Sequence, residues 1–188
     1  MAGSILGIDA FDQPNVQESK DNTKRVLEGF KRSGKLPAAQ AVPAADATGA
    51  LRGLLGQAEK GAYFATMAYA ERTATSERAL REIRQSVRDA TKHATTAGYG
   101  PRFLHSTGQL HKGGPPKGLF LQIVQDDRED IAIPGQPYGF SVLKQAQALG
   151  DLESLTSRKL PVVRVSLGRS PARGWKELTA AVQAATRR

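Results

Sequence analysis

GLFLQIV, residues 118–124, is an almost continuous apolar run of strand length, with Gln122 as its polar member. A second run, AYFATMAY at residues 62–69, has the same character. Runs of this length without polar alternation are typical of strands that are buried on both faces of a parallel sheet. The two segments therefore predict an α/β fold.

Helical patterns alternate with strand patterns along the rest of the chain. Apolar residues at helical spacing predict a helix that Thr75 or Ser76 caps and that ends near Lys92. The other predicted elements are a short helix at 49–58, strands at 93–97 and 161–167, and helices at 140–149 and 175–185. Gly150 is predicted to interrupt the helix at 140–149, and a second helix or turn then runs through Leu152 and Leu155. This order predicts a three-layer α/β domain with a mainly parallel, four-stranded sheet. Ligands of such sheets bind at the C-terminal ends of the strands.

An amphipathic helix is predicted near the N-terminus, from Pro14 to about Gly34. Proline suits the first helical turn, and glycine suits the position just beyond the end. Gln13 and Lys20 are seven residues apart, so about 700° of rotation returns them to nearly the same direction beside the apolar stripe. An amide and an ammonium on one helix edge can reach one polar ligand. A solvated helix face with a lysine on it explains the same pattern.

These patterns divide the chain into three parts. Residues 1–34 contain the predicted amphipathic helix and the segment before it. Residues 35–48 form an Ala/Pro-rich linker, and residues 49–188 form the α/β domain. The apolar residues 3–8 resemble the end of an element whose beginning is missing. We therefore expect the chain to be a C-terminal piece of a longer enzyme, or a truncated gene product.

Composition narrows the class of protein. The 188 residues include no cysteine, so a disulfide framework, a thiolate nucleophile and a Cys-based metal site are excluded. No apolar run approaches the roughly 20 residues that span a bilayer, and we expect a cytoplasmic protein with no membrane partner. The net charge of +9 is spread in ones and twos and is often beside acids, which does not favour nucleic-acid binding. Attraction of phosphorylated small molecules accounts for the charge as well.

A second cluster of polar residues lies between the strands at 93–97 and 118–124. Its candidate ligand-binding residues are Arg102, His105, Gln109, His111 and Lys112, with four glycines among residues 99–114. A cationic, hydroxyl-rich loop complements phosphate or sugar oxygens, and histidine moves protons near neutral pH. Three alternatives stay open: histidines that bond loop carbonyls, a zinc site completed by acids at 126–130, and Ser106 or Thr107 as a nucleophile. The spacing fits no established metal motif, and we predict neither a metal nor a cofactor.

The FDQ of residues 11–13, followed by Val16 and Lys20, resembles the F-D-Q-x-x-V-x-x-x-K signature near the C-terminus of glucose-6-phosphate isomerases. Residues 103–114, 118–124, 134–138 and 148–151 resemble the C-terminal part of the bacterial group in which a transaldolase is fused ahead of the isomerase. The resemblance implies a sugar-isomerase (SIS-type) α/β fold and a place in glycolysis and gluconeogenesis.

The resemblance also implies roles for individual residues. Gln13 falls on the position that contacts the sugar phosphate, and Lys20 falls on the position that reaches the ring oxygen during ring opening. His111 lies in HSTGQLHKG, residues 105–113, which is similar to a family stretch whose later histidine helps to open the ring. Arg102, His105, Gln109 and Lys112 would bind substrate.

The implied reaction interconverts glucose 6-phosphate and fructose 6-phosphate through an enediol, which needs a carboxylate base. No motif here matches the family's catalytic glutamate, its Ser/Thr-rich phosphate loop or its upstream arginine motif. We therefore expect remaining isomerase sequence or another subunit to complete the pocket, and the isolated chain to be inactive. The alternative is a non-catalytic module that binds sugar phosphates or docks on a partner subunit.

Overall fold

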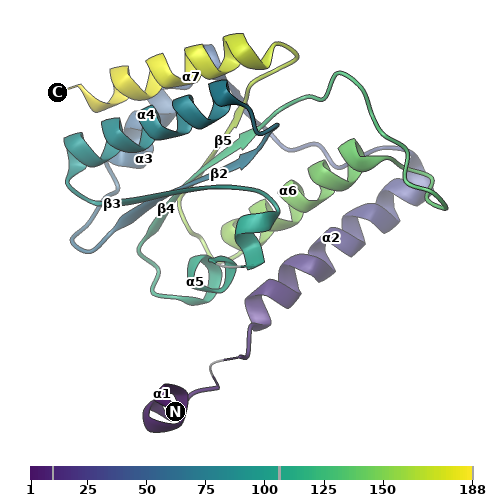
Figure 1. Ribbon diagram of the computed structural model, residues 1–188, viewed down its shortest axis with the longest axis horizontal. Helices are drawn as coiled ribbons and strands as arrows, with labels where there is room; N and C mark the ends of the chain where they lie inside the picture. The colour runs from purple at the N-terminus through teal and green to yellow at the C-terminus, as the bar shows by residue number, and fades with distance from the viewer. Residues whose placement is uncertain (10, 106, 188) are drawn as a thin grey trace.

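A parallel β-sheet forms the centre of the computed structural model, which describes residues 1–9, 11–105 and 107–187, without the side chains of residues 104 and 105 (Figure 1). Within those residues the sheet has five strands, in the order β1-β5-β4-β2-β3. They are β1 (Val42–Pro43), β2 (Tyr63–Tyr69), β3 (Ala94–Tyr99), β4 (Gly118–Val124) and β5 (Val162–Ser166). Every neighbouring pair is parallel, which confirms the α/β class.

Helices cover both faces of the sheet (Figure 1). One face carries α3 (Thr48–Leu55), α4 (Ala74–Thr91) and α7 (Pro171–Thr186). The other face carries the 3₁₀-helix η2 (Arg102–His105), α5 (Gly108–Gly113) and α6 (Phe140–Thr156), and α2 (Pro14–Ser33) packs on α6. Two further short helices, α1 (Ala2–Leu6) and the 3₁₀-helix η1 (Ala44–Asp46), precede α3.

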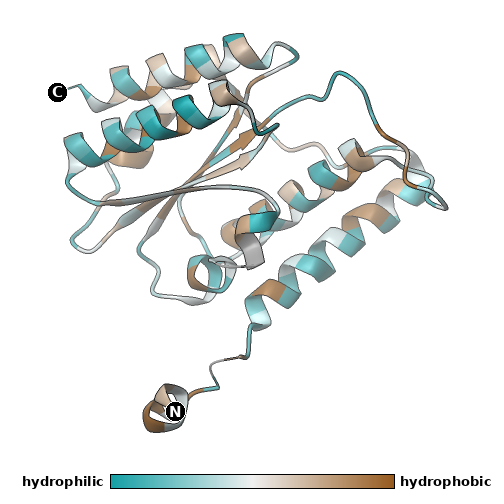
Figure 2. Ribbon diagram, viewed as in Figure 1, coloured by the Kyte–Doolittle hydropathy of each residue, from teal (hydrophilic) through white to brown (hydrophobic). Residues whose placement is uncertain are grey.

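The apolar strands are buried as their sequences predict. All of β4 is buried, and the centre of the sheet is predominantly hydrophobic in Figure 2, whereas α4 turns a hydrophilic side outward. Gln122, the polar member of β4, is fully buried and donates a hydrogen bond from Nε2 to the carbonyl of Ala148, at 2.8 Å. The internal bond satisfies the amide, so this residue does not interrupt the strand.

The prediction of four strands is wrong, because a fifth strand lies in the Ala/Pro-rich segment that we described as a linker. Val42 and Pro43 of β1 pair in register with Val165 and Ser166 at the edge of the sheet. A two-residue edge strand has almost no sequence signal, and proline is tolerated at an edge because one backbone N–H faces away from the ladder.

Gly150 does not interrupt a helix, contrary to the prediction; it lies inside the continuous helix α6. A Cβ at this position would lie 2.8 Å from Oγ1 of Thr23 and 3.1 Å from the carbonyl oxygen of Ser19, both on α2. The glycine is therefore a point of close approach between α2 and α6.

The cap of α4 also differs from the prediction of Thr75 or Ser76. Thr73 caps this helix, and its Oγ1 accepts a hydrogen bond from the N–H of Ser76.

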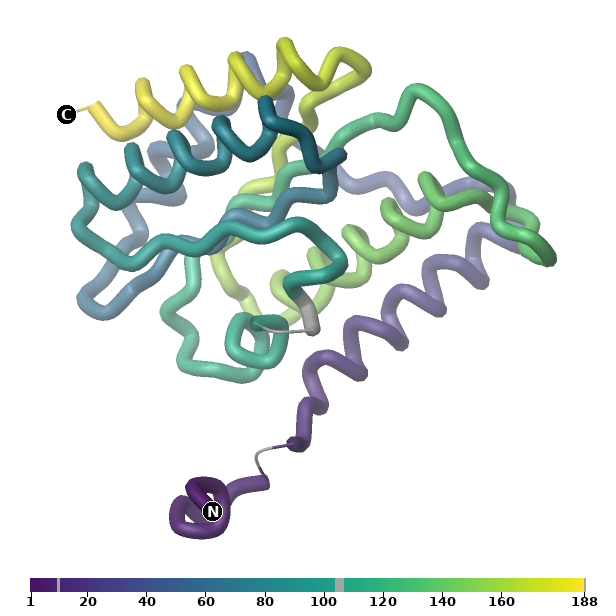
Figure 3. Tube along the Cα trace, viewed as in Figure 1, coloured from purple at the N-terminus to yellow at the C-terminus, as the bar shows by residue number. Residues whose placement is uncertain are grey.

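The helix α2 matches its prediction at both ends. Pro14 occupies the first turn, and Gly34 follows the last residue with φ 69°, a left-handed conformation that favours glycine. The 125–139 connection leaves the sheet and reaches the far end of α2 (Figure 3), where the rings of Phe30 and Tyr138 pack edge to face at 6.3 Å. In the described part of the chain, no helix has the length and apolar character needed to cross a bilayer.

Candidate functional site

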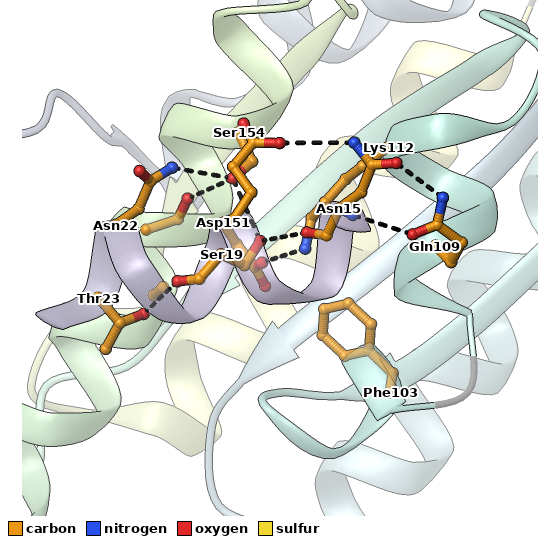
Figure 4. A network of polar contacts seen from close by, with 12 residues as sticks. Asn15, Ser19, Asn22, Thr23, Phe103, Gln109, Lys112, Asp151 and Ser154 are labelled. Carbon is orange, nitrogen blue, oxygen red and sulfur yellow. Dashed lines mark hydrogen bonds and ion pairs between the residues drawn. The ribbon is translucent and has the colours of Figure 1, made fainter. Parts of the chain in front are cut away.

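The short helix α5, which carries three of the predicted site residues, is clamped to the start of α2 (Figure 4). The Oε1 of Gln109 accepts the backbone N–H of Asn15 at 3.0 Å, and its Nε2 donates to Oδ1 of Asn15 at 2.7 Å. Gly113 makes room for this pair, since a Cβ there would lie 2.1 Å from Oδ1 of Asn15. Gln13, the residue before α2, makes no capping bond with its side chain, so Gln109 supplies the missing cap. Both ends of the Gln109 amide are used within the protein.

Lys112 forms a fully buried ion pair. Its Nζ lies 2.5 Å from Oδ1 of Asp151 on α6, and the side chains are 1% and 0% exposed. The hydroxyl of Tyr69 donates to Oδ2 of the same carboxylate. Burial lowers the pKa of Lys112, and the negative charge of Asp151 opposes that change. The ammonium is neutralised inside the protein, so this position does not suit the substrate contact predicted for Lys112.

His111 is buried among aromatic rings. Its ring stacks on Tyr63 with centroids 5.6 Å apart and meets Phe120 edge to face at 5.4 Å. Its Nδ1 lies 3.0 Å from the hydroxyl of Tyr63. Burial, with a smaller effect of the Lys112 charge, lowers the pKa of His111 to about 4. The imidazole is therefore neutral at neutral pH, able to donate or accept a hydrogen bond but not to act as a cation.

A cavity of about 270 Å³ adjoins His111 beside the edge strand β3. Its polar lining residues, besides His111, are Thr66, Thr96, Tyr99, Arg102 and Thr107. The structure thus brings two predicted residues, Arg102 and His111, to one cavity. The size and the hydroxyl groups suit a small polar ligand.

Gln13 and Lys20 lie elsewhere. Both are exposed, and in the described residues neither side chain has a hydrogen bond or an ion pair. Five residues separate Asn15 from Lys20, which corresponds to about 140° around the helix axis. Asn15 faces α5, so Lys20 projects away from that contact, toward a different side of α2. As far as their side chains are described, the predicted residues therefore do not form one enclosed pocket.

Two residues named in the sequence analysis, His105 and Ser106, lie partly or wholly outside the described residues. His105 belongs to η2, but its side chain lies outside the described residues, as does all of Ser106. Thr107 uses its hydroxyl to donate to the carbonyl of Phe103 at 3.1 Å. Within residues 1–9, 11–105 and 107–187, no group of three or more acids or histidines is placed to hold a metal ion.

A much larger cleft, of about 1010 Å³, lies at the carboxyl ends of the strands. As far as the described residues go, none of the seven predicted site residues lines it. Its walls come from the connection that follows β2, the connection that follows β4, and the first turns of α4, α6 and α7. The rule that ligands of parallel sheets bind at the carboxyl ends indicated this edge. The sequence has no recognisable motif at this edge, so the rule could not indicate which residues line the cleft.

Comparison with known proteins supports the fold alone. No protein-family model and no curated protein matches the chain. Among solved structures, the hypothetical protein TT0462 from Thermus thermophilus is similar, with a TM-score of 0.58 and 21% sequence identity. The match covers 72% of this chain and 37% of that structure, so this chain corresponds to little more than a third of its neighbour. The similarity shows that the α/β arrangement recurs and shows nothing about activity.

Proposed function

We propose that this chain is the C-terminal segment of a glucose-6-phosphate isomerase, of the kind fused to a transaldolase, and that it supplies one wall of a sugar-phosphate site. The observation that carries the proposal is the placement of Gln13 and Lys20. Both side chains are exposed, Lys20 on α2 and Gln13 on the residue that precedes the helix, and neither has a partner among the described residues. The F-D-Q-x-x-V-x-x-x-K resemblance assigns sugar-phosphate contacts to these same two positions.

The proposed chemistry is aldose–ketose isomerisation through an enediol. The Lys20 ammonium would donate a proton toward the ring oxygen during ring opening, and the Gln13 amide would contact the phosphate or a hydroxyl. The carboxylate base and most phosphate ligands would come from remaining isomerase sequence or from another subunit. An SIS-type arrangement of the sheet and a cytoplasmic location belong to the same proposal.

The rigidity of α2 supports this role. The Gln109 cap fixes the first turn of α2. A bidentate ion pair ties the helix to the segment that follows α6, with Nη1 of Arg158 donating to Oε1 of Glu18 at 2.7 Å. Side chains presented from a fixed helix keep their relative positions, which favours ligand binding. Gln109 would then contribute as a positioning residue, and not by touching the substrate.

Calorimetry with fructose 6-phosphate tests the proposal. We expect the wild-type chain to bind, and Lys20→Ala to weaken the affinity by about 10-fold, the loss of one hydrogen bond to a charged group. Arg32→Ala is the matched control, since Arg32 is an exposed cation on the same helix, about 120° from Lys20. Equal affinities for the wild type and Lys20→Ala would contradict the proposed wall.

The alternative function, a non-catalytic module that binds sugar phosphates or docks on a subunit, has its own supporting observation. Met1, Ile5, Leu6, Ile8 and Phe11 are all largely exposed, in a segment that extends away from the sheet (Figure 1). Fructose 6-phosphate binding by the chain, without restored isomerase activity when the remaining isomerase sequence is added, would favour this alternative.

A further inference from the structure

The carboxyl-edge cleft lies at the point where the chain changes direction across the sheet. From β2 the chain passes to β3 on one side, and the next strand, β4, lies on the other side of β2. The connections after β2 and β4 therefore diverge, and a crevice opens between them. Crevices at such positions are the common ligand sites of open parallel sheets.

Two buried side chains in this cleft retain unpaired N–H donors. Gln125, at the end of β4, is 5% exposed, and its Nε2 has no hydrogen-bond partner among the described residues. Trp175 of α7 is 2% exposed, and its Nε1 likewise lacks a partner there. Within the same residues, the one fully enclosed side-chain atom without a partner is Nε of Arg164, so both donors keep some exposure, and both residues line the cleft. Both donors are therefore free to bond an acceptor of a ligand in the cleft.

The first turn of α7 adds further donors to the same wall. Pro171 occupies its first position, and Ser170, which precedes it, forms no capping bond with its side chain. The two other helix starts in the cleft are already satisfied: Thr73 caps α4, and Asp130 accepts the N–H of Ser141 in α6 at 2.8 Å. The positive end of α7 therefore faces the cleft together with the Gln125 and Trp175 donors.

Charge and apolar surface divide the cleft into an inner part and a rim. Lys144 and Asp127 neutralise each other, with Nζ and Oδ1 2.5 Å apart. Glu71, Arg128 and Glu129 are exposed and have no ion pair in the described part of the chain, so solvent screens them. Two large apolar side chains, Ile131 and Phe140, also line the cleft while remaining more than half exposed. The inner part offers donors to an oxyanion, and the rim offers apolar contact to the body that carries it.

We propose that the carboxyl-edge cleft is a binding site for an oxyanion, a phosphate or a carboxylate, carried on a small apolar body. The Nε2 of Gln125, the Nε1 of Trp175 and the first-turn amides of α7 hold the oxyanion, while Ile131 and Phe140 contact the body. The site shares no residue with the Gln13–Lys20 edge and does not depend on isomerase activity.

The chain reports on this site directly, because Trp175 is its single tryptophan. We expect phenyl phosphate and benzoate to change the tryptophan fluorescence saturably. Inorganic phosphate should bind about 10-fold more weakly, because it lacks the apolar body. Phenol, which lacks the oxyanion, should leave the fluorescence unchanged. Lys20→Ala should bind phenyl phosphate as the wild type does, which separates this site from the proposed isomerase site.

Gln125→Leu removes the donor at similar volume and should weaken phenyl phosphate binding about 10-fold or more, the loss expected for one hydrogen bond to an anion. Gln183→Leu, a substitution at an exposed position near the other end of α7, is the matched control and should bind normally. Trp175→Phe keeps an aromatic ring but removes the indole N–H. Because this variant has no tryptophan, its binding of phenyl phosphate is compared with that of the wild type by equilibrium dialysis. No saturable change at millimolar phenyl phosphate, equal binding of phenol, or wild-type affinity in a correctly folded Gln125→Leu variant would overturn the proposal.

Discussion

Replacing Lys112 with methionine is expected to destabilise the protein by about 3–5 kcal/mol, the usual effect of removing one partner from a buried ion pair. The side chains of Lys112 and Asp151 are 1% and 0% exposed, so water cannot take the place of the missing ammonium. Asp151 would keep the Tyr69 hydrogen bond but would remain as a buried, unneutralised carboxylate. The physical cause is the desolvation of that charge and not the loss of contact area, because methionine fills most of the same volume.

The double variant Lys112→Met/Asp151→Asn separates these causes. Asparagine can still accept from the Tyr69 hydroxyl and carries no charge, so the double variant should be more stable than Lys112→Met alone by about 1–2 kcal/mol. Urea unfolding followed by circular dichroism measures the differences, with Lys176→Met on the exposed side of α7 as the control. If Lys112→Met costs less than about 1 kcal/mol and instead abolishes fructose 6-phosphate binding, the ammonium serves a ligand and our assignment of an internal role is wrong.

Three further predictions concern the helix contacts and the buried histidine. Gly150→Ala should destabilise the protein by about 1–3 kcal/mol, since its Cβ would lie 2.8 Å from Oγ1 of Thr23, whereas Gly29→Ala, which meets nothing within 4 Å, should be neutral or stabilising in the same urea assay. Gln109→Leu should destabilise by about 1–2 kcal/mol and speed amide exchange in the first turn of α2; unchanged exchange there would contradict the capping role. The folded-state pKa of His111 is about 4, below its unfolded value of about 6.5, so stability should be independent of this group above pH 6.5 and fall by up to ~3 kcal/mol as the pH drops from 6.5 to 4. His111→Gln should flatten that part of the unfolding profile, and an unchanged slope would show that another group titrates.

Local pattern was sufficient for most elements of this fold. The runs at 62–69 and 118–124 predicted the two central strands because a strand buried on both faces must be apolar at successive positions. Pro14 and Gly34 predicted the limits of α2 because backbone geometry at helix ends depends on the residues located there. The predicted helix ending near Lys92 and the predicted helix at 175–185 correspond to α4 and α7, although α7 begins four residues earlier, at Pro171.

The incorrect predictions share one physical origin, because each concerns a residue whose role depends on a segment distant in the chain. Gly150 was predicted to interrupt a helix by its own propensity, but the approach of α2 determines that the position needs no side chain. The strand β1 was missed because its two residues are extended only through pairing with β5. Burial of Lys112 depends on Asp151, which lies 39 residues further along the chain.

The candidate sites divide in the same way. The sequence placed Gln13 and Lys20 seven residues apart and so predicted one helix edge, although Gln13 in fact precedes α2 with non-helical backbone angles. It also gathered Arg102, Gln109, His111 and Lys112 into one loop, but only tertiary structure decided their uses. Gln109 caps α2, Lys112 neutralises a buried carboxylate, and Arg102 and His111 line a cavity. The cleft beside Gln125 and Trp175 is likewise a product of strand order, because only the assembled sheet brings the two residues, 50 positions apart, to one crevice.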